Sequence, residues 1–584
     1  MGLTTLNGTH LYHAFISGAR QLINQKAMLN KINVFPVPDG DTGSNMAAMM
    51  QRIITDSIVD EHLGKTLESI SSAAIAGSRG NSGIIFSEYL NGIYQGLKDA
   101  DTADVKLFHK AVLNGIKMAY AAISNPIEGT ILTVFRKAFK VDSHIDDFVT
   151  YFSTIKNQAL IALEQTPKEL EVLRLNKVVD AGAKGLTEFI EGVNFYFENG
   201  IEMIEKKEKE KLEEPNHHDI HLETITERYC TEALIGNGKV TPQELKELFK
   251  EDGSSLVVSG RIDKMRIHIH TNHPDQVFFK LRNYGEIIEQ KVDDMIRQNQ
   301  AAQPNHPRIA VVTDSIADIP LEIADKYHIH LIPMYLLVDD VSYVDKLTIS
   351  TSTFYQMMDI NEHFSSSQPD KITIERNLNF LMEHYDHVLV ITVASRLSGT
   401  YNAISQFAKV HEKIIVLDSK HNSGSQGLVV IKAAEMAYEG KSIDEILEVI
   451  PKMIRRTKIY VSVKTLKYMV RQGRVSKVTG LIGKIINLKP VISLGKDGEG
   501  IIAAKALSLA GNVKQIMKLL KRAPVESYAI VHSLAEKRAQ KLADKVEALT
   551  GKKPLFIEMI SPIVAMNAGI GAVAVALTYE KEVD

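Results

Sequence analysis

Two aspartates separated by one glycine mark the stretch of the sequence that is richest in chemical groups. Asp39 and Asp41 lie in the run NVFPVPDGDTGSNM, residues 33–46. Two such carboxylates repel each other, and a hard divalent cation with oxygen ligands removes that penalty. Mg²⁺ in particular often shares its ligands with substrate phosphates. The pair therefore predicts a site for Mg²⁺ and a phosphorylated ligand, and a plain surface turn is the alternative.

Four polar, glycine-bearing turns each precede a stretch of helical pattern. They lie at residues 42–45, 80–83, 126–132 and 178–186. Free N–H groups at the start of a helix suit a phosphate, so the turns together predict a ring of ligand-binding loops. For each turn taken singly, an ordinary helix connection is the alternative. The residues expected to face the ligand are Thr42, Gly43, Ser44, Asn45, Gly80, Asn81, Ser82 and Gly83.

The lone cysteine and two histidines form a second candidate site. His268 and His270 alternate along the strand-like run MRIHIHT, so both imidazoles project from one face of the strand. Cys230 begins the same part of the chain. A thiolate with two imidazoles favours Zn²⁺ and leaves a fourth position open. Sequence spacing does not fix a distance, and a buried cysteine beside surface histidines is the alternative.

The last part of the chain carries groups that suit an anion without a metal. Ser366 lies in the turn SSSQPD, and Ser398 lies in RLSGTYNA before a helix. Arg474 in RQGRVS suits a carboxylate or a phosphate. Asn567 begins NAGIGA, which is expected to form an anion-binding nest before a C-terminal helix. No acidic pair occurs among these loops, so binding is favoured over catalysis; ordinary helix capping is the alternative.

These groups fall in three blocks of the sequence. Residues 1–205 have apolar residues at helical spacing almost throughout. Residues 222–298 contain two strand-like runs, 254–260 and 265–271, and predict a small α+β region. Residues 308–584 alternate strand-like runs with helical segments, which is typical of a largely parallel sheet covered by helices. The predicted fold is therefore multidomain: an all-α domain, an α+β middle domain and an α/β C-terminal domain.

Composition excludes several classes of protein. With 45% hydrophobic and 24% charged residues over 584 positions, the chain is neither disordered nor a polytopic membrane protein. A net charge of −3 gives no basic surplus for nucleic acid. A single cysteine excludes an intrachain disulfide, and the first ten residues lack a signal peptide, so a cytoplasmic location is expected. Residues 562–578 are almost uncharged, and we interpret them as a glycine-rich loop leading into a buried helix rather than a membrane span.

The motifs of the first block carry a family resemblance. VFPVPDGDTGSNM, SRGNSG, EGT and VVDAGAKGL occur in family order and resemble the nucleotide-binding domain of bacterial fatty acid kinases and of the dihydroxyacetone kinase L subunit. The resemblance implies a helical barrel that binds ATP or ADP through a pair of Mg²⁺ ions. Asp39 and Asp41 match the metal ligands, and Asn33 stands where the dihydroxyacetone kinase type has another aspartate. The turns at 42–45 and 80–83 match the phosphate cradle, and Thr130 and Asp180 match further nucleotide-side positions.

The other two blocks extend the resemblance. YCTE and HIHTN resemble the middle domain of the fatty acid kinases, which implies a zinc site at Cys230, His268 and His270. TDSIAD, SSQP, LSGTY, LDS and QGRVS resemble the DegV family of fatty-acid-binding proteins, which implies two subdomains with a lipid chain between them. The matching positions for the lipid carboxyl group are Ser366, Ser398 and Arg474; Asn567 stands where the family typically has a histidine.

Together the blocks predict a fatty acid kinase fused to an acyl-binding domain, which phosphorylates a fatty acid carboxylate to an acyl phosphate. Two alternatives remain open: a kinase for a polyol such as dihydroxyacetone, and a non-catalytic lipid-binding or sensory protein that holds nucleotide. The expected partners are a fatty acid, a downstream acyltransferase and a second copy of the chain in a homodimer. No nucleic acid and no transmembrane segment are expected, and contact with a membrane surface would be transient.

Overall fold

The computed structural model describes residues 3–36, 38, 40–142, 144–203, 225–303, 305–339, 341–358, 363–471 and 489–583. The chain divides into two compact units, residues 1–299 and 300–584. The multidomain organisation, with a helical N-terminal region and an α/β C-terminal part, is confirmed. The first unit contains both the helical block and the small α+β block. The predicted borders between three domains stay predictions.

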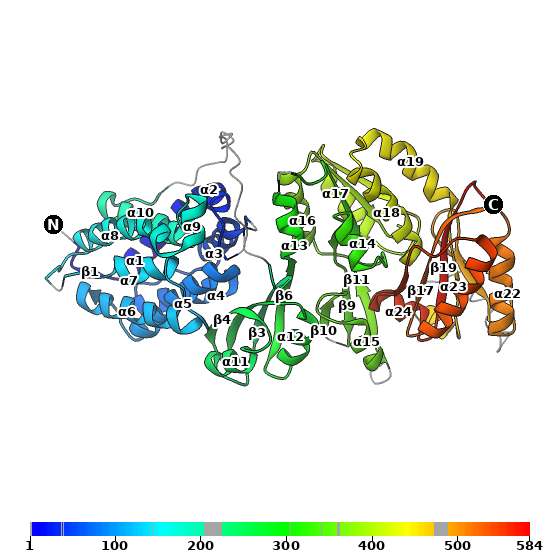
Figure 1. Ribbon diagram of the computed structural model, residues 1–584. Coiled ribbons are helices and arrows are strands. Elements are labelled where there is room, and N and C mark those ends of the chain that lie inside the picture. Colours follow the sequence, from blue (N-terminus) through cyan, green and yellow to red (C-terminus); the bar gives the residue numbers. More distant parts are fainter. Residues whose placement is uncertain are drawn as a thin grey trace. The chain divides into compact units, whose positions relative to one another are not determined.

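Helices form the first part of unit 1, as the periodicity predicted (Figure 1). Capping side chains begin several of them: Asn7 accepts from the N–H of His10, and Asp104 accepts from the N–H of Leu107. A short ladder of β1 (Thr5–Leu6) and β2 (Ala103–Asp104) joins them. The helices are α1 (Gly8–Asn24), α2 (Lys26–Lys31), α3 (Thr42–Asp56), α4 (Leu63–Gly77), α5 (Gly80–Leu97), α6 (Val105–Ala122), α7 (Ile131–Ala138), α8 (Phe148–Glu169), α9 (Glu171–Asn176) and α10 (Ala181–Asn199).

An aromatic core holds these helices together. Phe86 of α5 contacts Phe135 of α7 and Phe189 of α10 edge to face, with ring centroids 6.4 and 5.1 Å apart. Helices α5 and α6 approach closely because both carry glycine at the contact: a Cβ atom on Gly92 would lie 2.5 Å from Cα of Gly115. This core fixes the positions at which the predicted ligand loops begin.

A four-stranded antiparallel sheet completes unit 1, in the order β4-β5-β3-β6. Its strands are β3 (Tyr229–Gly236), β4 (Ser254–Arg261), β5 (Lys264–Thr271) and β6 (Glu286–Asp294). Helices α11 (Pro242–Phe249) and α12 (Pro274–Leu281) pack against one face through Phe249 and Phe278, which join a cluster with Ile235 and Ile267. The sequence predicted β4 and β5 but not β3 and β6, because charged residues such as Glu232 and Lys291 interrupt their apolar pattern.

Unit 2 begins with a parallel sheet in the order β13-β12-β7-β8. Its strands are β7 (Ile309–Asp314), β8 (His330–Ile332), β12 (His387–Thr392) and β13 (Ile414–Asp418). A three-stranded antiparallel sheet follows in the order β10-β9-β11, from β9 (Tyr335–Val338), β10 (Val341–Val344) and β11 (Phe364–Ser367). The predicted parallel arrangement holds for the first sheet.

A six-stranded sheet in the order β16-β15-β14-β19-β17-β18 corrects the rest of that prediction. Its neighbouring strands are antiparallel except β17 and β18, because β15 and β16 pair as a hairpin and β19 runs back between β14 and β17. Its strands are β14 (Thr457–Ser462), β15 (Val491–Leu494), β16 (Gly500–Ala504), β17 (Val525–His532), β18 (Ile557–Met559) and β19 (Val573–Tyr579).

The helices of unit 2 surround these sheets (Figure 1). They include α14 (Leu321–Lys326), α15 (Thr351–Met358), α16 (Lys371–His384), α17 (Thr400–Ala408), α18 (Ser423–Tyr438), α19 (Ile443–Arg456), α20 (Lys467–Arg471), α22 (Leu509–Leu520), α23 (Glu536–Thr550) and α24 (Pro562–Ala568); α13 (Met295–Ala302) spans the border of the two units. In the described part of the chain, none of the helices combines the length and the apolar character needed to cross a bilayer.

The interpretation of residues 562–578 is wrong in its order of elements. The helix α24 comes first, the glycine turn follows it, and the buried segment is strand β19. Gly569 and Gly571 adopt φ of 77° and 86°, which a helix cannot continue through. Valines at alternate positions, Val573 and Val575, favour a strand after the turn. The NAGIGA turn therefore precedes a strand and not a C-terminal helix.

Candidate functional site

The acidic loop of unit 1 leads directly into α3. Asp41 is the residue before the helix, and Gly40 with φ of 67° turns the chain into it. The side chain of Thr42 donates to Oδ1 of Asn33 at 2.7 Å, so Asn33 orders the loop. The N–H of Ser44 donates to Oδ1 of Asn30 at 2.9 Å. Asp39 lies outside the described residues, and its assignment as a metal ligand stays a prediction.

Contacts join the starts of four helices into one site. Asn45 at the start of α3 lies against Gly80 at the start of α5, where a Cβ atom would lie 2.8 Å from its Nδ2. Ser82 of α5 lies against Gly182 at the start of α10. Asp180 accepts from the N–H of Ala183 at 2.7 Å and also from the backbone of Ile131, the first residue of α7. Aligned helix dipoles and N–H groups at one place suit a polyphosphate.

The remaining residues predicted for this site have structural partners or a free polar atom. Thr130 caps α7 and donates to the carbonyl of Ile127 at 2.7 Å. Gly43 packs tightly against α2, where a Cβ atom would strike the carbonyl of Lys26. Gly83 lies in the first turn of α5. Oδ1 of Asn81 is buried and has no hydrogen-bond partner among the described residues. A buried polar atom of this kind is available to bind a ligand.

Burial raises the pKa values of both acidic groups described at the helix starts. It raises the pKa of Asp180 to about 7, against the lowering effect of its backbone hydrogen bonds. It also raises the pKa of Asp41, and Asp293 and Glu232 add to this while Lys291 opposes it. A bound cation would relieve this cost, because it stabilises the ionised carboxylate. The electrostatics of Asp41 therefore fit a Mg²⁺ ligand.

The sheet presents a face of charged and metal-binding groups toward these helices. Strand register places His270, Cys230 and Asp293 side by side in one row, and His268, Glu232 and Lys291 in the next. Nζ of Lys291 lies 2.6 Å from Oδ2 of Asp293. Glu232, Lys291 and Asp293 were not predicted as site residues from the sequence. Their signal was the two-residue spacing that Cys230 and Glu232 share with the two histidines, which places all of them on one face.

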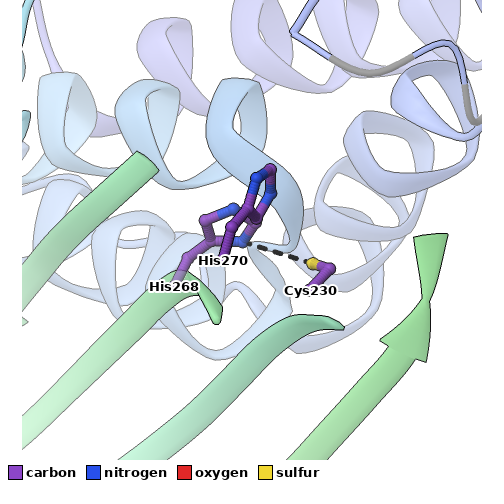
Figure 2. Close-up of side chains that lie close together, drawn as sticks. All are labelled: Cys230, His268 and His270. Carbon is purple, nitrogen blue, oxygen red and sulfur yellow. Dashed lines mark hydrogen bonds between the residues drawn. The ribbon is translucent and has the colours of Figure 1, made fainter. Parts of the chain in front are cut away.

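Cys230, His268 and His270 meet as predicted, and the histidines are buried rather than on the surface. The possible ligand atoms of the three side chains all lie within 4.8 Å of one another. Figure 2 shows them reaching from two neighbouring strands toward one point, with Sγ of Cys230 3.7 Å from Nδ1 of His268. Burial lowers the pKa of His270 to about 3, so this imidazole is neutral, the form that binds metals.

The donor set fits a zinc ion. Burial raises the pKa of the Cys230 thiol, and nearby acidic groups raise it further. A metal cation would offset this and hold the thiolate. Nε2 of His268 is buried and has no hydrogen-bond partner among the described residues, and its Nδ1 lies 3.1 Å from Oε1 of Glu232. A metal-binding histidine commonly has this arrangement, with one nitrogen toward a carboxylate and the other toward the metal.

The zinc and nucleotide candidates adjoin each other. Oε1 of Glu232 also accepts from the N–H of Gly80 at 2.6 Å. Arg266, two residues before His268, donates to the carbonyl of Ala76 at the end of α4 at 2.6 Å. The sheet thus contacts the start of α5 and the end of α4, beside the proposed nucleotide site.

In unit 2 the structure brings the two serine-bearing segments together. Ser366 lies in strand β11 and not in a turn, because SSS pairs with β9. Ser398 lies before α17, and its Oγ is 2.8 Å from Oγ1 of Thr400. The side chain of Gln368, after β11, lies against Gly399. Both segments border an apolar cluster, against which Phe364 and Leu397 pack. The cluster includes Ile563 and Met566 of α24.

Asn567 and Arg474 are not placed in an anion site. Asn567 lies in α24, where Nδ2 donates to the carbonyl of Ile563 at 2.9 Å. Its Oδ1 is buried and has no hydrogen-bond partner among the described residues. No hydrogen bond within the described ranges links Asn567 to the serine-bearing segments. Arg474 lies outside the described residues, so its predicted contact with a carboxylate stays a prediction.

The acidic residues of TDSIAD have structural roles. Asp314 accepts from the backbone N–H groups of Val393 and Ile316 at 2.7 and 3.2 Å. Asp318 accepts from the N–H of Ser561 at 2.8 Å and pairs with Lys346 at 3.2 Å. These buried carboxylates tie α24 and the end of β12 to the loop after β7.

Family models match three parts of the chain. They are the DAK2 domain at residues 36–194, the fatty acid kinase A-like middle domain at residues 226–302, and a model described as uncharacterised protein, DegV family, at residues 308–580. All three agree with the family resemblance inferred from the motifs.

Individual proteins also resemble parts of the chain. An uncharacterized protein of Staphylococcus saprophyticus is 34% identical over 313 residues, 51% of this chain and 57% of the relative. The chain thus spans little more than half the length of that relative. A DegV domain-containing protein of Clostridium acetobutylicum is 32% identical over 276 residues, 46% of this chain and 98% of the relative.

Two solved structures align with part of the chain. One is a fatty-acid-binding DegV family protein from Thermus thermophilus, and the other is DegV, a fatty acid binding protein from Bacillus subtilis. Each is 25% identical, covers 47% of this chain and 99% of its own chain, and has a TM-score of 0.43.

Proposed function

Because the chain belongs to the DegV family and carries a DAK2 domain and a fatty acid kinase A-like middle domain ahead of its DegV domain, we propose that it is an ATP-dependent fatty acid kinase. The product would be an acyl phosphate. The observation that carries the proposal is the meeting of four helix starts beside Asp41, opposite the polar face of the sheet. This arrangement suits a metal-bound polyphosphate rather than a neutral ligand.

Each predicted residue has a role in this proposal. Asp39 and Asp41 hold Mg²⁺, which, when bound, neutralises charge on the β- and γ-phosphates. The segments 42–45 and 80–83 bind phosphate oxygens through those of their N–H groups that have no acceptor within the protein, whereas Asn30 holds the N–H of Ser44 and Glu232 holds the N–H of Gly80. Thr130 and Asp180 hold the starts of α7 and α10 in place on the nucleotide side. A fatty acid carboxylate is already ionised at neutral pH, so the acceptor needs no general base.

Lys291 of strand β6 adds a positive charge to the sheet face that lies beside the helix starts. Burial alone would lower its pKa, but Asp293, Glu232, Cys230 and Asp41 together raise it, so the side chain is charged. Its charge interacts electrostatically with that of Asp41 and lowers the pKa of that carboxyl group. We assign to Lys291 the stabilisation of negative charge that develops during phosphoryl transfer, an effect that is large where water is excluded.

Zinc at Cys230, His268 and His270 would stabilise the sheet face and contribute a positive charge beside the phosphates. In unit 2, Ser366 and Ser398 would hold the lipid carboxylate, and the apolar cluster that their segments border would receive the acyl chain. Arg474 and Asn567 remain proposed as further contacts of the carboxylate. Joining kinase and carrier in one chain raises the effective concentration of the acceptor to about millimolar where the linker permits contact. Where it does not, transfer would occur between two copies of the chain.

The experiment that tests the proposal supplies the full chain with Mg·ATP and a long-chain fatty acid. Hydroxylamine traps an acyl phosphate as a hydroxamate, which mass spectrometry detects. The proposal predicts a hydroxamate with the wild type and none with Asp41→Asn. Phosphorylation of dihydroxyacetone but not of the fatty acid would favour the polyol kinase instead.

One observation favours a second candidate, a lipid sensor that holds nucleotide without turnover. The amide of Asn567 donates within its own helix, and an amide cannot supply the cationic contact of a histidine. A fatty acid that copurifies with the chain and is never phosphorylated would establish this candidate and exclude the kinase.

A further inference from the structure

Glu232 touches both the nucleotide site and the zinc candidate. It lies in the middle of the polar sheet face, fully buried, between His268 on β5 and Lys291 on β6. One oxygen, Oε1, accepts from the N–H of Gly80 at 2.6 Å and lies 3.1 Å from Nδ1 of His268. The other oxygen, Oε2, has no hydrogen-bond partner among the described residues.

A fully buried carboxylate is costly unless nearby groups stabilise its charge. Glu232 has a donor and a cation beside it: its Oε1 accepts from the N–H of Gly80, and strand pairing places Lys291 of β6 opposite it. Glu232 is therefore an anion that can only accept hydrogen bonds. It occupies the N–H of Gly80 at the start of α5, next to the N–H groups of residues 81–83 that the proposed function assigns to phosphate.

We infer that Glu232 is a positioning residue that couples a metal ion at Cys230, His268 and His270 to nucleotide binding at the start of α5. The inference rests on the proposed nucleotide and zinc sites. A metal on Nε2 of His268 leaves Nδ1–H to donate to Glu232, and the cation strengthens that hydrogen bond. Negative charge on Glu232 is then drawn away from α5, which lowers its repulsion of a phosphate. The same contact fixes the N–H of Gly80.

Coupling of this kind is reciprocal and can be measured by binding alone. Calorimetry would compare the affinity of the full chain for Mg·ADP with zinc bound and after zinc removal by 1,10-phenanthroline. We expect zinc to tighten ADP binding about fivefold or more in the wild type, the lower range for allosteric coupling. In Glu232→Gln the factor should fall below about twofold, because the charge that transmits it is gone.

A matched control is Glu286→Gln, the same change at an exposed position at the other end of the sheet, on β6. It should keep the wild-type coupling. Equal ADP affinity with and without zinc in the wild type would overturn the inference. Full coupling in Glu232→Gln, or a chain that binds no zinc, would also overturn it.

A second measurement needs no variant and so does not depend on how Glu232→Gln folds. Hydrogen exchange of a peptide that contains Gly80 should slow when zinc is added, since the metal fixes the acceptor of that N–H through His268. Unchanged exchange would contradict the inference. Because neither readout uses phosphoryl transfer, a chain that shows the coupling but forms no acyl phosphate would refute the fatty acid kinase alone.

Discussion

Replacing Gly80 with alanine tests the start of α5 as a phosphate-binding element. Gly80 adopts φ of 62°, a conformation that favours glycine. A Cβ atom there would lie 2.8 Å from Nδ2 of Asn45, which is closer than side-chain carbons approach. Either Asn45 or the first turn of α5 must move, and both belong to the proposed phosphate cradle.

The size of the effect follows from these two contacts. Left-handed backbone costs a non-glycine residue about 1–2 kcal/mol, and lower entropy of the unfolded chain returns about 0.4–1 kcal/mol. Gly80→Ala should therefore destabilise unit 1 by about 1 kcal/mol from the backbone alone. Displacement of the N–H groups should weaken Mg·ADP binding by about tenfold to a hundredfold, or about 1.4–2.7 kcal/mol.

Gly200→Ala is the matched control. Gly200 follows α10 with φ of 70°, and a Cβ atom there would meet nothing within 4 Å. This variant has the same backbone cost without the collision and lies at the far end of its helix from the site. Calorimetric titration with Mg·ADP should show wild-type affinity for Gly200→Ala and the weakened affinity for Gly80→Ala. Equal affinities in the two variants would refute the assignment of α5 as a phosphate-binding helix.

Further predictions concern the charged groups and the lipid site. Asp41→Asn removes a half-buried carboxylate whose pKa is raised, so metal-free protein should melt at a higher temperature while Mg²⁺-dependent ADP binding weakens more than about tenfold; a lower melting temperature would contradict this. Burial raises the pKa of Asp180 to about 7, so the folded chain keeps a proton that the unfolded chain loses near pH 3.8. Stability in melting curves should therefore fall as the pH rises between these values, and Asp180→Asn should flatten the slope. Lys291→Met should lower phosphoryl transfer about a hundredfold while Lys264→Met, at the first residue of strand β5 in the same sheet, leaves it unchanged; equal losses would remove the proposed role. Ser398→Ala should weaken fatty acid binding about tenfold in a fluorescence displacement titration, and wild-type affinity would exclude this serine as a ligand of the carboxylate.

Local patterns predicted most of the secondary structure and the chemistry of single loops. The glycine turns before α3, α5 and α10 are visible in the sequence because glycine and short polar residues favour helix starts. The alternation in MRIHIHT predicted the strand β5 with both histidines on one face, which the structure shows. The zinc candidate could therefore be proposed before any distance was known.

Long-range pairing accounts for what the sequence did not predict. Strands β3 and β6 carry charged residues on a face that is buried against helices, so Glu232 and Lys291 looked like surface residues. Only the register of β3 with β5 and β6 brings them beside Cys230 and Asp41. The prediction for residues 562–578 was wrong for a different reason. An apolar run as short as 573–579 fits a helix or a strand, and its pattern alone does not decide between them.

The proposed function requires that metal-bound nucleotide lies where α3, α5, α7 and α10 begin. A crystal structure with ADP and Mn²⁺ tests it directly, because anomalous scattering locates the manganese without assumptions about ligands. We expect manganese on the carboxylate of Asp41 and phosphate oxygens at the unoccupied N–H groups of segments 42–45 and 80–83. Nucleotide bound elsewhere, or the Asp41 carboxylate turned away from every manganese position, would contradict it.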